Sequence, residues 1–281
     1  MVLTGAAWTF VFLGAATLLW PRRAALSLGL LGTGYLLALI AGLVGAAFII
    51  PVALLVLAAY AVAPQRTRAW QIAGHVLFIG VALGLGFHVL PGFNNPQLVG
   101  PAPLTSDGAP FTFYLNLDKP LAGFWVLLVW PALRVRRSSW SWAHGLLIGL
   151  ATAVVCLGLA ITLGKLAFAP KWPGFTWLWA LNSLLMVSLV EEALFRGYIQ
   201  EALSRRFRER RHGEAFAIGI AAALFGAVHV IGGLAYVLVT GLAGVGYGLA
   251  YRRGGLEAAM LAHFTLSMLH FTLFTYPMLA T

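Results

Sequence analysis

Hydrophobic residues occupy this chain in long, nearly unbroken runs, and short polar or basic segments separate one run from the next. A helix rises about 1.5 Å per residue, so about 20 apolar residues are needed to cross a hydrocarbon core of about 30 Å. The runs lie near residues 3–20, 25–43, 45–63, 71–90, 119–134, 142–165, 175–200, 214–232, 234–251 and 256–277. This pattern predicts an all-α fold, a polytopic transmembrane helix bundle of about ten spans (eight to ten).

The composition indicates the same class of protein. Hydrophobic residues make up 61% of the chain and charged residues 9%, and the mean hydropathy is +0.90. A soluble domain carries roughly 25% charged residues, so a soluble fold is excluded. The single cysteine, Cys156, excludes an internal disulfide and a cysteine-based metal site.

The net charge of +10 would suit a nucleic-acid ligand, but its distribution argues for a membrane. Fourteen of the 18 lysines and arginines fall in five clusters, and two spans separate each cluster from the next. The clusters are Arg22 and Arg23; Arg66 and Arg68; Arg134, Arg136 and Arg137; Arg205, Arg206, Arg208, Arg210 and Arg211; and Arg252 and Arg253. This alternation is typical of cytoplasmic loops. We therefore expect the lipid bilayer as a partner, no nucleic acid, and both termini on the non-cytoplasmic side.

One long polar segment, residues 91–118, interrupts the hydrophobic pattern. It contains five prolines together with Asn94 and Asn95, which predicts an irregular extramembrane loop on the non-cytoplasmic face. The loop could recognise a partner or simply connect two spans. Residues 1–135, with this loop, form the N-terminal part of the predicted organisation.

Two adjacent carboxylates, Glu191 and Glu192, lie inside the run 175–200 and are followed by Arg196. A charge at membrane depth costs several kcal/mol by most estimates, so these residues are functional candidates. The i,i+4 spacing predicts that Glu192 pairs with Arg196, while Glu191, turned by about 100°, meets a substrate or a water. The alternative is a buried ion cluster that ties helices together.

Two histidines in later runs complete the candidate site. His229 lies late in the run 214–232, and His263 begins a polar stripe that continues with Ser267 and His270 at i+4 and i+7. Counting residues along the helices places Glu191 and His263 at similar depth, whereas His229 lies a turn or two too high. These histidines could instead be packing residues, and His270 could replace His263.

The motifs resemble those of the CPBP family of intramembrane proteases, which includes type II CAAX prenyl endopeptidases and bacterial abortive-infection-type proteins. The chain reads Glu191-Glu192-Ala-Leu-Phe-Arg196, then Phe225-Gly-Ala-Val-His229, then His263-Phe-Thr-Leu-Ser267. The resemblance covers roughly residues 140–275, which would form the CPBP-like core. Ser267 departs from it, because the family usually has Asn or Asp there.

The resemblance implies an intramembrane endopeptidase with a membrane-associated protein or peptide as substrate. Glu191 would be the general base, and His229 and His263 would orient the water or stabilise the oxyanion. Ser267 would assist with one donated hydrogen bond, where an Asn amide offers two. No cofactor is required in this interpretation. A zinc ion held by Glu191, His229 and His263 is the alternative.

Two other functions compete with this hypothesis. Ser267 would suit a catalytically silent family member that acts as an immunity or scaffold protein. Buried Glu, Arg and His would also suit a proton-coupled transporter. In each case the expected location is the bacterial inner membrane, as a multi-pass integral protein. No residue pattern indicates prenyl recognition or an oligomeric state.

Overall fold

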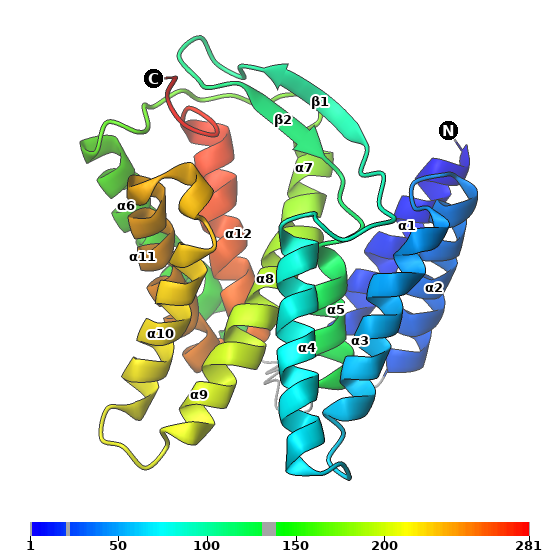
Figure 1. Ribbon diagram of the computed structural model, residues 1–281. Helices are drawn as coiled ribbons and strands as arrows, with labels where there is room; N and C mark the ends of the chain where they lie inside the picture. Colours follow the sequence, from blue (N-terminus) through cyan, green and yellow to red (C-terminus); the bar gives the residue numbers. More distant parts are fainter. Residues whose placement is uncertain (1, 21–22, 131–138, 281) are drawn as a thin grey trace. The chain divides into compact units, whose positions relative to one another are not determined.

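The computed structural model describes residues 2–20, 23–130 and 139–280 and is an all-α bundle (Figure 1). All ten predicted spans contain an apolar helix in these residues, so the fold-class prediction is confirmed. Five helices are long and apolar enough to cross a membrane, and five shorter apolar helices have 10–17 residues. Four arginines of the predicted clusters, Arg22, Arg134, Arg136 and Arg137, lie outside the described residues.

The chain divides into two compact units. The first comprises Met1–Pro96 and Tyr114–Pro131, and the second comprises Gln97–Phe113 and Ala132–Thr281. The helices of the first unit are α1 (Val2–Leu18), α2 (Ala24–Ile40), the short 3-10 segment η2 (Ala46–Phe48), α3 (Ile49–Ala61), α4 (Arg68–Gly86) and α5 (Pro120–Val129).

Small residues and stacked aromatic rings hold the first unit together. Gly34 on α2 lets α1 approach closely, since a Cβ there would lie 2.7 Å from a methyl carbon of Val11. Trp125 on α5 stacks on Phe78 of α4 with ring centroids 3.9 Å apart, and its indole N–H donates to the carbonyl oxygen of Leu55 at 2.8 Å. The buried indole thus fills space and keeps its one donor satisfied.

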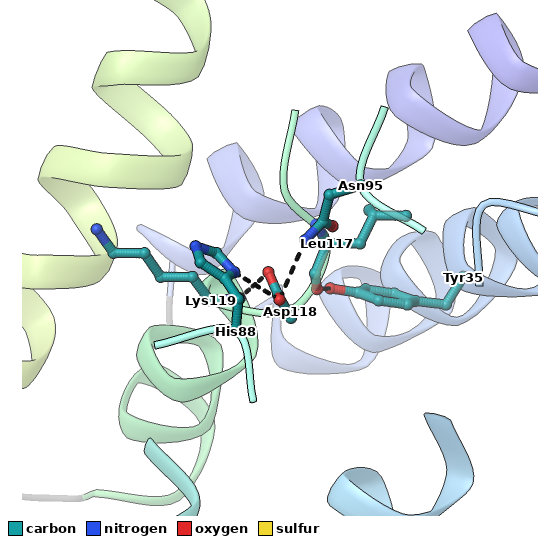
Figure 2. A network of polar contacts seen from close by, with 6 residues as sticks. All are labelled: Tyr35, His88, Asn95, Leu117, Asp118 and Lys119. Carbon is teal, nitrogen blue, oxygen red and sulfur yellow. Dashed lines mark hydrogen bonds and ion pairs between the residues drawn. The ribbon is translucent and has the colours of Figure 1, made fainter. Parts of the chain in front are cut away.

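A polar network closes one end of the first unit (Figure 2). The buried carboxylate of Asp118 accepts from His88 Nδ1 at 2.7 Å, from Asn95 Nδ2 at 3.1 Å and from the backbone N–H of Lys119 at 2.8 Å. Tyr35 on α2 donates to the carbonyl oxygen of Leu117 at 2.6 Å. The network therefore joins α2 and the segments that flank α4 and α5.

The second unit contains α6 (Ser139–Thr162), α10 (Gly213–Ala227), the 3-10 turn η5 (Val230–Gly232), α11 (Leu234–Gly254) and α12 (Leu256–Leu273). Between α6 and α10 runs a continuous 31-residue helix, Thr176–Arg206. Its parts are α7 (Thr176–Asn182), the π-helical segment η3 (Ser183–Ser188), α8 (Leu189–Glu192), the π-helical segment η4 (Ala193–Gln200) and α9 (Glu201–Arg206). Since π-helical turns are rare and concentrate at functional sites, this helix is of special interest.

The segment 91–118 is more ordered than the sequence analysis predicted. Strands β1 (Gln97–Ala102) and β2 (Phe111–Tyr114) pair in a two-stranded sheet. The residues between them bind the C-terminal segment, through Ala109 N–H to Met278 and Ala280 N–H to Asp107, both at 2.9 Å. Five prolines concealed the strands, but Phe111 and Phe113 alternate into the interior as strand residues do.

Candidate functional site

Glu191 and Glu192 are the last two residues of α8, between the two π-helical segments, and both are buried. Glu192 Oε2 lies 3.1 Å from Arg196 Nε, and both side chains are 0% exposed. Arg196 also donates from Nη2 to the carbonyl oxygen of Gly244 on α11 at 3.0 Å. The i,i+4 spacing thus correctly predicted the ion pair, and the extra hydrogen bond helps to offset the desolvation of two buried charges.

His263 on α12 joins both carboxylates. Its Nδ1 lies 2.9 Å from Glu192 Oε1, and its Nε2 lies 4.0 Å from Glu191 Oε2. We assign the Nδ1 proton to the hydrogen bond with Glu192, because an ionised carboxylate can only accept. In the neutral ring, Nε2 is then an acceptor that faces Glu191. Glu192 therefore bridges Arg196 and His263, while Glu191 remains beside the other ring nitrogen.

Aromatic rings hold this cluster from two neighbouring helices. Tyr247 on α11 stacks flat on the His263 imidazole, with centroids 4.6 Å apart and an interplanar angle of 9°. Phe225 on α10 meets the same imidazole edge-on, at 5.9 Å and 85°. The Arg196 guanidinium carbon lies 4.7 Å from the Phe225 ring centroid and 5.5 Å from that of Tyr247. Both rings thus contact the cation as well as the imidazole.

Tyr247 was not found by the sequence analysis, although the chain does carry a signal for it. It lies in a glycine-rich part of α11, where small residues permit close helix packing. A Cβ on Gly246 would lie 2.1 Å from Thr152 Oγ1 of α6, and one on Gly244 would lie 3.0 Å from Ala222 of α10. A large aromatic residue among these glycines points into a helix junction.

His229 lies in a different setting from the one predicted. We expected it late in a span ending near residue 232, but α10 ends at Ala227 and His229 occupies the following turn. Its Nδ1 lies 2.7 Å from the carbonyl oxygen of Phe225, to which it must donate, so the imidazole satisfies a carbonyl at the helix end. Gly233, with φ of +84°, lets the chain turn into α11.

The contacts of His229 run through aromatic side chains. Its ring lies 4.8 Å from Phe225 and 5.7 Å from Tyr236, and Phe225 in turn contacts His263. The ring is half-buried, and with the Nδ1 proton donated to the backbone, Nε2 is an acceptor in the neutral form of the ring. It becomes a donor only when the ring is protonated.

Ser267 and His270 follow His263 on α12. Ser267 is half-buried, one turn beyond His263 on the same face of the helix. His270 packs against Tyr276, with ring centroids 4.9 Å apart. The imidazole that contacts the two carboxylates is therefore that of His263.

A metal ion fits this arrangement poorly. Across the described residues 2–20, 23–130 and 139–280, no three His, Cys, Asp or Glu side chains converge as metal ligands must. The zinc set considered above, Glu191, His229 and His263, is thus not assembled. His263 Nδ1 and Glu192 are bound to each other instead.

Comparison with known proteins places this site in a family. Residues 172–269 match the family model for type II CAAX prenyl endopeptidases, Rce1-like. The match confirms the resemblance that the motifs suggested, and it contains every candidate residue from Glu191 to Ser267. No curated protein and no solved structure matches the chain. With its apolar helices and this match, the protein is an integral, multi-pass membrane protein.

Proposed function

We propose that this protein is an intramembrane endopeptidase in which Glu191 activates the attacking water. The observation that carries the proposal is the arrangement around His263. Glu192 binds Nδ1 of His263. This contact orients the imidazole so that its Nε2 lies 4.0 Å from Glu191 Oε2. A water between these two atoms can donate one hydrogen bond to each, and its lone pairs then face a peptide carbonyl. Glu191 and His263 thus supply the two acceptors that orient a nucleophilic water.

The chemical steps follow from these positions. The water oxygen bonds to the carbonyl carbon as Glu191 takes a water proton, and the carbonyl oxygen becomes an oxyanion. The Ser267 hydroxyl is a donor available to that oxyanion, and His229 Nε2 is a second one when its ring carries both protons. Glu191 then passes its proton to the leaving amine as the C–N bond breaks. Arg196 pairs with Glu192, and Glu192 keeps His263 oriented.

The substrate in this proposal is a membrane-associated protein or peptide, and the location is the bacterial inner membrane. The family name supports a cleavage site near a protein's C-terminus. Water activation needs no metal here, because the base and the orienting imidazole are both protein groups.

The test uses purified protein in liposomes with C-terminal peptides that carry a CAAX sequence, with and without a prenyl group. We expect release of a C-terminal fragment, detected by mass spectrometry, and no loss of rate with 1,10-phenanthroline. Glu191→Gln in the same liposomes is the matched control and should release nothing. Release that stops with the chelator and returns with zinc would contradict the metal-free mechanism.

One observation supports a second candidate, a family member without protease activity. Ser267 offers one hydrogen-bond donor where the family usually has an amide with two, and loss of one oxyanion donor costs on the order of 10²–10³ in rate. Ser267→Asn separates the candidates. A rise in the rate of fragment release would support the oxyanion role, whereas inactivity of both forms on all peptides would favour a binding or immunity protein.

A further inference from the structure

Arginines from three helix ends gather at one end of the second unit. α9 ends at Arg206, the connection to α10 carries Arg208, Arg210 and Arg211, and α11 ends with Arg252 and Arg253. Arg252 Nε lies 2.8 Å from Glu214 Oε1 in the first turn of α10, so the end of α11 lies beside the start of α10. We call the exposed set the arginine surface: Arg205, Arg206, Arg208, Arg210, Arg211, Arg252 and Arg253.

Acidic side chains neutralise only part of this surface. Three ion pairs are present: Arg205 with Glu201 at 3.0 Å, Arg208 with Glu209 at 3.7 Å, and Arg252 with Glu214 at 2.8 Å. Seven arginines against three glutamates leave a net formal charge of +4. Within the part of the chain that the structure describes, four of the seven have no acidic partner: Arg206, Arg210, Arg211 and Arg253.

Helix dipoles account for some of these arginines but not for all. A cation in the last turn of a helix is stabilised by about 0.3–1 kcal/mol, which suits the arginines that end α9 and α11. Arg210 and Arg211 follow α9 in the connection, outside any last turn. The guanidinium carbon of Arg210 lies 5.4 Å from the Phe207 ring centroid, and Arg211 is exposed. Neither ion pairs nor helix dipoles therefore compensate all the positive charge of the arginine surface, which favours binding of an external anion.

The length of the helices places the surface at headgroup depth. α11 has 21 residues and spans about 31 Å, close to the roughly 30 Å of a hydrocarbon core. Arg252 and Arg253 in its last turn thus lie where the hydrocarbon meets the headgroups. Guanidinium groups bind phosphate oxygens through two parallel hydrogen bonds. We propose that the arginine surface binds the phosphate headgroups of anionic phospholipids in the adjoining leaflet.

The test is a titration of the detergent-purified, full-length protein with phosphatidylglycerol, followed by native mass spectrometry. Each basic residue near an anionic surface contributes about a fivefold gain in affinity, so Arg211→Gln/Arg253→Gln should bind about 30-fold more weakly. Arg23→Gln/Arg68→Gln is the matched control, because it removes two exposed arginines at the starts of α2 and α4, outside the arginine surface. It should change the affinity less than about threefold.

Two further ligands separate a lipid site from a general affinity for anions. Phosphatidylcholine should bind at least about tenfold more weakly than phosphatidylglycerol, because it carries no net charge. Inorganic phosphate at equal concentration should leave phosphatidylglycerol binding unchanged. Equal losses in the two double variants, equal binding of the two lipids, or displacement by inorganic phosphate would each overturn the proposal. The binding measurement is independent of the proposed protease activity, so the two can fail separately.

Discussion

Glu191 and Glu192 are neighbours in the chain, yet their carboxylates have different surroundings. Glu192 is fully buried and contacts both Arg196 and His263, whereas Glu191 lies 4.0 Å from the other ring nitrogen of His263. A carboxylate that already holds two partners is suited to bracing the site. The carboxylate beside an imidazole acceptor is suited to taking a proton from water. The two residues should therefore respond differently to the same substitution.

Glu191→Gln should abolish hydrolysis and leave the protein folded. The amide keeps the shape of the side chain but cannot accept the water proton, so the rate should fall on the order of 10²–10⁴-fold. Glu192→Gln removes the charge that pairs with Arg196, which can cost roughly 3–5 kcal/mol in stability. Peptide cleavage and melting temperature in detergent measure the two effects. If Glu191→Gln stayed active while Glu192→Gln was inactive and normally folded, Glu192 would be the base and Glu191 the structural residue.

Tyr247 should position His263 through its ring. Tyr247→Leu removes the flat stacking partner, and such pairs contribute about 0.5–1.5 kcal/mol, so kcat should fall up to about tenfold. KM should change little, and the pH profile of kcat should shift because the imidazole is held less firmly. Tyr247→Phe keeps the ring and should retain both kcat and the profile.

A second buried aromatic residue provides the control for Tyr247. Phe78→Leu removes a fully buried ring that stacks on Trp125 in the first unit. It should lower the melting temperature without moving the pH profile. If Phe78→Leu and Tyr247→Leu shifted the pH profile equally, Tyr247 would have only a packing role.

At the scale of elements, hydropathy located the helices well but their ends less well. The run 214–232 predicted a helix through His229, but the observed helix stops at Ala227, and the imidazole that follows binds the carbonyl oxygen of Phe225. That interaction is local chemistry, which an average over apolar residues does not register. The sequence did not predict the π-helical segments beside Glu191 and Glu192 either, since the same residues would also suit an α-helix.

The Asp118 network gives an element-scale prediction about acid stability. Burial alone would raise the pKa of Asp118, but the hydrogen bonds from His88, the Lys119 backbone and Asn95, with the charge of His88, lower it below its ordinary value of 3.8. A lowered folded-state pKa adds stability above the unfolded value, and this contribution disappears as the pH falls through the folded value. Asp118→Asn should therefore lower the melting temperature at pH 7, by the equivalent of about 2 kcal/mol.

The control for this variant is Asp107→Asn, which changes an exposed carboxylate in the connection between β1 and β2. It should leave the melting temperature unchanged within error. The deficit of Asp118→Asn relative to wild type should shrink below about pH 4. A deficit that stayed constant down to pH 2 would show that the charge of Asp118 does not stabilise the first unit.

At the scale of the whole molecule, the sequence predicted the helical architecture and the ion pair between Glu192 and Arg196. The runs of apolar residues predicted ten helices because each crossing requires the same length, and the Glu192–Arg196 pair followed from helix geometry. Pairings between distant segments were beyond such reasoning. The contact of Tyr247 with His263 joins two helices, and the β1–β2 connection binds residues near Met278. Neither contact can be recognised from the spacing of hydrophobic and polar residues along the chain.

The remaining prediction concerns membrane topology. The helix Thr176–Arg206 has 31 residues, enough to cross the bilayer, and it ends in the arginine surface. The positive-inside rule places that end in the cytoplasm. The β1–β2 connection binds the segment that follows α12, and α12 begins only three residues after Arg253 and then runs across the membrane. The connection should therefore face the opposite side.

Single cysteines at two exposed positions test this arrangement, with Cys156, which is fully buried, changed to Ala. Asp107→Cys reports on the β1–β2 connection and Glu209→Cys on the arginine surface. Asp107 is chosen over Gly100 of β1 as the labelling position, because a Cβ at residue 100 would lie 2.0 Å from the carbonyl oxygen of Phe111. In spheroplasts, a membrane-impermeant maleimide should label Asp107→Cys at once and Glu209→Cys only after permeabilisation. Equal labelling of both in intact spheroplasts would place the two segments on one face and refute the topology.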